Sequence, residues 1–202
     1  MAPNPRGARI FIAEKGLIIP TQEINILAGE NLTPAYLRIN PWGLLPALAL
    51  DDGTVITQTP CICRYLETLH PAPNLLGRDA LETARIGAWE RCSEMNGQNA
   101  IAEFCRNQCA PLASRAVPGF AGVKALPELV ARGRQRAAWY DEQMENQLAT
   151  SAYVAGPRYT AADSTAQCAM DFANAVGLPV PAGHQHTLRW LQNLSTRPSA
   201  TA

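Results

Sequence analysis

Hydrophobic and polar positions divide the chain into a mixed first part and a helical second part. Proline opens an apolar run that ends at a glycine, so residues 5–16 are predicted to form a helix. The run from Ile18 to Ile26 is rich in isoleucine and predicts a strand, although polar residues interrupt its alternation. A threonine-proline pair then predicts a short helical turn over residues 33–39.

A hairpin signal follows at Asp52-Gly53, because the turn needs a positive φ that glycine supplies without steric cost. The flanking residues 45–50 and 54–57 are predicted to be its two strands. Gln58-Thr59-Pro60 then opens a helix that runs to residue 69, with proline in the first turn. The backbone amides at such a helix start attract anions, carboxylates among them.

The second part carries no strand signal. Residues 70–74, with two prolines, predict a linker. Thr160 and Asp163 stand three apart, the spacing of a capping box at a helix start. Prolines and glycines make 108–124 a loop, and helices are predicted at 79–107, 125–149, 160–176 and 184–196. The chain is therefore expected to hold an α/β domain at 1–70 and an all-α helical bundle at 79–202.

Composition narrows the possible partners. The 17 Lys and Arg residues balance 17 Asp and Glu residues, so no nucleic-acid partner is expected. No apolar run has the length of a membrane span or a signal peptide, and the expected location is the cytoplasm. The six cysteines are expected to be reduced thiols, and no further ligands stand near them to complete a metal site.

The segment NPRGARIFIAEKG at 4–16 is similar to the first helix in a bacterial and fungal branch of the cytosolic glutathione transferase family. Five motifs together resemble that family over nearly the whole chain. They are NPWGLLPAL at 40–48, DDGTVI at 51–56, RYLE at 64–67, HPAPNLLG at 70–77 and TAAD at 160–163. The resemblance implies a thioredoxin-like first domain that binds glutathione as co-substrate. It also implies a helical second domain that forms the electrophile pocket, a homodimer, and attack of the glutathione thiolate on small electrophiles.

The resemblance also assigns the glutathione-binding residues. Pro46 is expected to be cis, so that the backbone of Leu45 pairs with the cysteinyl unit of glutathione like an added strand. Gln58 and Thr59 match the pair that grips the γ-glutamyl end. Many family members have Glu-Ser or Gln-Ser at this pair, and Gln58 and Thr59 keep the needed donors and acceptors. Relative to the members with Glu, Gln58 implies the loss of a charged partner for the glutathione ammonium.

The start of the chain departs from the family pattern. The family stabilises the thiolate with a Tyr, Ser or Cys near the first helix, and none stands before Tyr36. Asn4 is the best-placed donor, with a helix N-cap before Pro5 as the alternative. Lys15 is expected to be a solvated surface charge. Family members also place a strand before this helix. Either residues upstream of Met1 supply that strand, or the first domain is N-terminally short and the chain is expected to bind glutathione weakly.

Helical spacing brings Trp89, Ser93 and Asn96 toward one face, where they are candidates for the electrophile pocket. Glu90, Arg91 and Glu94 are expected to face elsewhere. Two alternatives remain beside the transferase hypothesis. One is a non-catalytic binding or interaction protein of the same fold. The other is a glutathione-dependent peroxidase or disulfide reductase, which would use Cys61.

Overall fold

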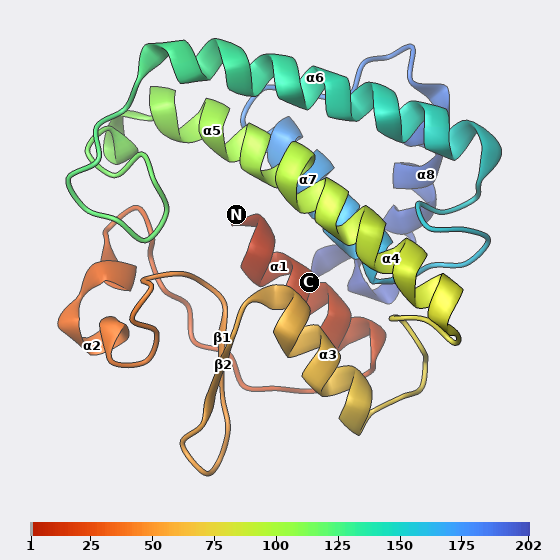
Figure 1. Cartoon of the computed structure of the whole chain (residues 1–202), viewed down its shortest axis with the longest axis horizontal. Helices are drawn as coiled ribbons and strands as arrows, with labels where there is room; N and C mark the ends of the chain where they lie inside the picture. Colours follow the sequence, from red (N-terminus) through yellow and green to blue (C-terminus); the bar gives the residue numbers. More distant parts are fainter. Residues whose placement is uncertain (1) are drawn as a thin grey trace.

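The computed structural model describes residues 2–202, and Figure 1 shows its arrangement. The first part contains a small antiparallel hairpin in which Leu48 pairs with Ile56, as the Asp52-Gly53 signal predicted. Short helices flank this hairpin. The bounds of the elements are α1 (Pro3–Glu14), α2 (Pro34–Leu37), β1 (Ala47–Ala49), β2 (Val55–Thr57) and α3 (Thr59–Leu69).

The second part is helical, which confirms the expected fold class. Helix α6 runs beside α5 along the top of Figure 1, and α1 packs against both α3 and α7. A π-helical segment at Ser93–Gln98 interrupts the helix predicted at 79–107. The bounds are α4 (Ala80–Cys92), α5 (Asn99–Gln108), α6 (Pro127–Thr150), α7 (Ala161–Ala175) and α8 (Gln185–Ser195), with 3-10 turns at Glu30–Leu32, Ala110–Leu112 and Pro198–Thr201.

The strand predicted from Ile18 to Ile26 is wrong. Residues 18–25 form neither helix nor strand and belong to no sheet, and Ile18 is 98% exposed. Within residues 2–202, β1 and β2 pair only with each other. No backbone N–H from Ile18 to Ile24 donates to a backbone carbonyl. A strand exists only through a neighbour, so the apolar pattern alone did not make one here.

One core joins the two parts. Phe11 of α1 and Ile62 of α3 belong to the same buried cluster as Tyr140 and Trp190 of the helical part. The capping box at the start of α7 is present, as predicted, and its Asp163 is fully buried. Burial raises the pKa of this carboxyl to about 6, although its hydrogen bonds act in the opposite direction. The α7 start is therefore a central support of the fold.

Lys15 is not the solvated surface charge that the sequence suggested. Its side chain has no exposed surface, and its ammonium forms an ion pair with Glu67 at 2.5 Å. The groups that enclose it come from 50 to 60 residues further along the chain. Lys15 therefore ties α1 to the end of α3 and to the linker that follows.

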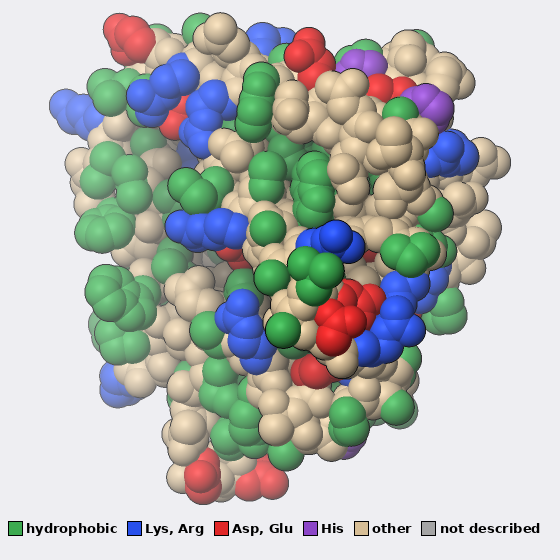
Figure 2. Space-filling model, turned by 45° about the vertical axis from the view of Figure 1, so that its right-hand side comes forward, with side chains coloured by type: hydrophobic (Ala, Val, Ile, Leu, Met, Phe, Trp, Pro, Cys, Tyr) green, Lys and Arg blue, Asp and Glu red, His purple; other side chains and the backbone are tan. Residues whose placement is uncertain are grey.

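The surface carries both signs of charge. Figure 2 shows Lys and Arg side chains interspersed with Asp and Glu on one face, without a continuous field of one sign. All six cysteines are free of disulfides. Among residues 2–202, no three His, Cys, Asp or Glu side chains come together in a way that would hold a metal ion. In the same residues, no helix combines the length and hydrophobicity needed to cross a membrane.

Candidate functional site

The two predicted glutathione-binding pairs lie at the same end of the hairpin. Ala47 pairs with Thr57, so the same register places Pro46 opposite Gln58, one residue further along. The Leu45–Pro46 peptide bond is cis, as predicted. The short hairpin turn therefore places the residues that lead into β1 next to the start of α3.

The first turns of α1 and α3 meet at this end of the hairpin. The Thr59 hydroxyl donates to the carbonyl oxygen of Asn4 at 2.8 Å. Gly7 permits this approach, because a Cβ at that position would lie 3.3 Å from the methyl carbon of Thr59. Two positive helix ends therefore converge on one small region, which favours a bound anion.

The start of α3 leaves one backbone donor free for a ligand. Pro60 has no N–H, and the amides of Cys61 and Ile62 both donate to the carbonyl oxygen of Gln58. The Thr59 N–H has no backbone acceptor among the described residues. The Thr59 hydroxyl already donates its proton to the carbonyl oxygen of Asn4. The Thr59 backbone N–H is therefore the group best placed to donate to a carboxylate.

Gln58 has an unusual backbone. Its φ is +70°, and it is the one residue other than glycine with a positive φ in the described chain. Such a conformation costs about 1–3 kcal/mol in a non-glycine residue and is concentrated at functional sites. Its side chain is exposed at the tip of α3. The conformation turns the chain sharply from β2 into α3, beside Leu45 and Pro46.

Asn4 lies within the first turn of α1 and not at its N-cap. Helix α1 begins at Pro3, and its N-cap is Ala2, so the alternative of an Asn4 cap is wrong. Asn4 is exposed, and its side-chain amide makes no hydrogen bond within the described residues. Arg6, one turn inside the helix, is instead buried and paired with the carboxylate of Asp171. Of these two residues, only Asn4 offers a side-chain donor at the helix tip.

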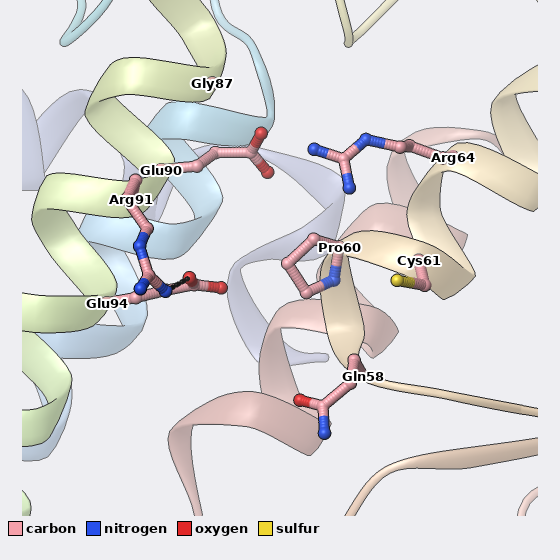
Figure 3. Close-up of a pocket in the computed structure, with 8 residues that line it drawn as sticks. All are labelled: Gln58, Pro60, Cys61, Arg64, Gly87, Glu90, Arg91 and Glu94. Carbon is pink, nitrogen blue, oxygen red and sulfur yellow. Dashed lines mark ion pairs between the residues drawn. The ribbon is translucent and has the colours of Figure 1, made fainter.

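A pocket of about 310 Å³ lies between α3 and α4, next to Gln58. Figure 3 shows the Glu90 carboxylate and the Arg64 guanidinium pointing toward each other across it. Burial raises the pKa of Glu90 to about 7, against the opposing effect of Arg64. The lining residues are Gln58, Pro60, Cys61, Arg64, Gly87, Glu90, Arg91 and Glu94.

All three residues that were expected to face elsewhere, Glu90, Arg91 and Glu94, line this pocket, so that expectation is wrong. Glu90 and Glu94 are four residues apart in the helix predicted at 79–107, and this helical spacing was the signal that would have found them. Arg64 sits on α3 and becomes their neighbour only through the packing of the two helices. Cys61 is exposed at the same pocket, so it lies on the α4 side of α3.

The three predicted electrophile-pocket residues take different positions. Ser93 is fully buried, and its hydroxyl accepts a hydrogen bond from Tyr140 at 2.7 Å. Trp89 is half-buried and packs against the core cluster. Asn96 is half-buried within the π-helical segment, with its amide nitrogen 3.7 Å from the sulfur of Cys92. Such π-helical segments are frequent at functional sites.

The hairpin with its cis proline, set against two helix tips and followed by a helical bundle, defines a thioredoxin-like domain joined to an all-helical domain. Two family models match this arrangement. The glutathione S-transferase N-terminal domain matches residues 2–69, and the glutathione S-transferase C-terminal domain matches residues 117–198. The chain belongs to the glutathione S-transferase family.

Relatives over the full length agree with this assignment. Glutathione S-transferase 2 of Saccharomyces cerevisiae is 30% identical, over 98% of this chain and 83% of the yeast protein. The crystal structure of Gtt2 from Saccharomyces cerevisiae superposes with a TM-score of 0.91 at 28% identity, covering 98% of this chain and 94% of that one. A glutathione S-transferase domain-containing protein of Marinobacter aquaeolei gives 0.90 at 29% identity, covering 98% and 96%. These homologues support glutathione conjugation as the function.

Proposed function

We propose that the chain holds glutathione at the end of the hairpin, between Leu45-Pro46 and the start of α3. The Leu45 backbone would pair with the cysteinyl unit in the manner of an added strand. The γ-glutamyl carboxylate would accept from the Thr59 N–H at the positive end of α3, with the exposed Gln58 side chain beside it. The observation that carries this proposal is the convergence of the cis peptide with two helix tips.

The thiolate needs its own stabilising group. A free thiol has a pKa near 8.5, and lowering it by two units requires about 2.7 kcal/mol of selective stabilisation. Asn4 is exposed on the first turn of α1, with an amide that can donate to sulfur. The Asn4 side chain and the positive end of α1 are therefore proposed to favour the thiolate together.

The thiolate would attack an electrophilic carbon of a small molecule, forming a thioether and releasing the leaving group with its electron pair. We assign the wall of the electrophile pocket to the helical part, at Asn96 in the π-helical segment. Trp89 and Ser93 support that wall from behind, because one packs against the core and the other is bonded to Tyr140.

Turnover of an activated aryl halide with glutathione tests this function. Saturable thioether formation is expected, and Asn4→Ala should lower kcat by about 10-fold to 100-fold if its amide stabilises the developing charge. Asn193→Ala, at an exposed position of α8, is the matched control and should leave kcat unchanged.

Two other results would replace the transferase proposal. Glutathione binding without turnover of any electrophile would identify a non-catalytic binding protein. Peroxide or disulfide reduction that disappears in Cys61→Ser would identify a reductase, since Cys61 is the exposed thiol nearest the start of α3.

A homodimer through the face of α3 and α4 is also proposed. The pocket there contains two cations and two carboxylates, so a copy related by a two-fold axis could pair Arg64 with the partner's acidic side chains. Sedimentation should show a dimer that Arg64→Glu weakens. Arg85→Glu, exposed on α4 outside the pocket, should leave it intact. A monomer at micromolar concentration would contradict this proposal.

We also propose that the protein detoxifies electrophiles in the cytoplasm. The six cysteines form no disulfide, which is typical of proteins kept in a reducing compartment. Cell fractionation, with thiol labelling of the recovered protein, tests the location directly.

A further inference from the structure

The loop between α5 and α6 reaches back to the first part of the molecule. Figure 1 shows this loop beside α2. The guanidinium of Arg115 donates to the carbonyl oxygens of Ile26 at 2.9 Å and Leu27 at 2.8 Å. The same side chain donates to Pro111 within its own loop. Residues 115–123, the contact loop, are thereby fixed against residues 26–29.

The contact loop touches a second place, the turn that leads into Leu45-Pro46. A Cβ placed on Gly119 would lie 2.3 Å from the carbonyl oxygen of Trp42, and its φ is +79°. It would also meet the side chain of Leu44 at 3.2 Å. Only glycine allows the contact loop to approach this turn so closely.

From the other side, polar side chains hold the same turn. The carbonyl oxygen of Leu44 accepts from the Tyr36 hydroxyl and from the Asn40 amide, both at 2.7 Å. The carbonyl oxygen of Gly43 accepts from the Asn31 amide, also at 2.7 Å. These three side chains are all buried. The residues just before Leu45 are therefore enclosed between this hydrogen-bond network and Gly119.

We propose that Gly119 and Arg115 are positioning residues for glutathione. They act through the turn at residues 40–44, which fixes where the Leu45 backbone presents its N–H and carbonyl groups. This inference rests on the proposed binding of glutathione at Leu45. A backbone that pairs with a ligand must be held within a fraction of an ångström, so a support on one side only is not sufficient.

Two glycines of the contact loop provide a matched test. Gly119 and Gly122 have nearly the same left-handed φ, +79° and +78°, but a Cβ on Gly122 would meet nothing within 4 Å. Alanine at either position introduces the same backbone strain. The difference between the two variants therefore reports the contacts of Gly119 with Trp42 and Leu44, the turn before Leu45.

We expect a selective loss of affinity for glutathione. Gly119→Ala should raise the Kd for glutathione, measured by calorimetry, at least five-fold relative to Gly122→Ala. In turnover it should raise KM for glutathione in the same proportion, with kcat and the KM for the electrophile within two-fold of the parent. Arg115→Gln, which adds no bulk, should shift both glutathione constants in the same direction.

Amide hydrogen exchange separates this inference from the proposed function. The Gly43 N–H donates to the Asn40 carbonyl at 2.9 Å, and its exchange should accelerate in Gly119→Ala and not in Gly122→Ala. If the parent protein binds no glutathione, the proposed function fails and exchange still shows whether the contact loop holds the turn. Unchanged glutathione constants and unchanged exchange in both Gly119→Ala and Arg115→Gln would overturn the inference.

Discussion

The ammonium nitrogen of Lys15 lies 2.5 Å from Oε2 of Glu67, and the Lys15 side chain is entirely buried. The same ammonium donates to the carbonyl oxygens of His70 at 2.8 Å and Pro73 at 2.5 Å. The other carboxylate oxygen of Glu67 accepts from the Leu75 N–H at 3.0 Å. This ion pair therefore holds the linker between the two parts of the chain against α1 and α3.

Removal of Lys15 should be strongly destabilising. Lys15→Met leaves the Glu67 carboxylate without its cation, and an uncompensated buried charge costs about 3–5 kcal/mol. Chemical denaturation measures the loss, and the double variant Lys15→Met with Glu67→Gln should recover part of it. The control is Lys124→Met, the other lysine of the chain, which is exposed. Equal stability of the two single variants would show that the buried pair contributes nothing.

Among the helix-capping residues, Asp163 should be the one whose replacement lowers the free energy of unfolding most. Its carboxylate accepts from the backbone N–H groups of Thr160 and Val154, both at 2.9 Å, and from the indole nitrogen of Trp190 at 3.0 Å. Asp163→Ala leaves these buried donors without an acceptor, so the free energy of unfolding should fall by about 3–5 kcal/mol.

A second aspartate cap provides the comparison. Asp79 accepts from the Glu82 N–H at 2.8 Å at the exposed start of α4. Asp79→Ala should cost about 1 kcal/mol, the usual value of a surface N-cap. If thermal or denaturant unfolding gives similar losses for the two caps, the contacts with Val154 and Trp190 are not stabilising.

These contacts show what could be predicted from the sequence. The capping box was predictable because Thr160 and Asp163 are three residues apart and act on each other's backbone. The hairpin was predictable for the same reason, since its turn and both strands are contiguous. The bonds from Asp163 to Val154 and Trp190 depend on how distant segments pack, and no local pattern encodes them.

The errors have the same origin. Lys15 resembled a surface residue because its partners lie more than 50 positions away. Ile18 to Ile26 had a strand-like composition, but a strand also needs a neighbour, and the segment pairs with none among the described residues. The α3–α4 pocket was missed because Arg64 and Glu90 meet only through helix packing. For the candidate site, the motifs predicted the cis proline. The hydrogen bond from the Thr59 hydroxyl to the Asn4 carbonyl was not predictable, because it joins two helix starts that are distant in the sequence.

Asp141 should make stability depend on pH. It is buried on α6, and burial raises the pKa of its carboxyl from 3.8 to about 7. The folded state therefore binds this proton more tightly than the unfolded state, so stability is lost as the pH rises from about 4 to 7. Asp141→Asn removes this penalty.

The measurement is the melting temperature of the parent and the variant across pH. At pH 8 Asp141→Asn should be more stable by about 1 kcal/mol, or about 2–4 °C in Tm, and the gain should vanish near pH 4. Glu142→Gln, the exposed neighbour, should change Tm at neither pH. A variant that is less stable than the parent at pH 8 would contradict the assignment of a buried, unpaired carboxyl.

The Thr59 hydroxyl should affect glutathione binding through the position of α1 and not through direct contact. Thr59→Val keeps the shape of the side chain but removes the donor to the Asn4 carbonyl, a bond of 2.8 Å. Loss of one such bond costs about 1 kcal/mol, so the Kd for glutathione should rise about five-fold. Thr59→Ser retains the hydroxyl and should bind within two-fold of the parent. If calorimetry gives the same Kd for glutathione for the parent and both variants, the hydrogen bond between Thr59 and Asn4 does not affect binding. The backbone N–H of Thr59 alone would then account for carboxylate binding.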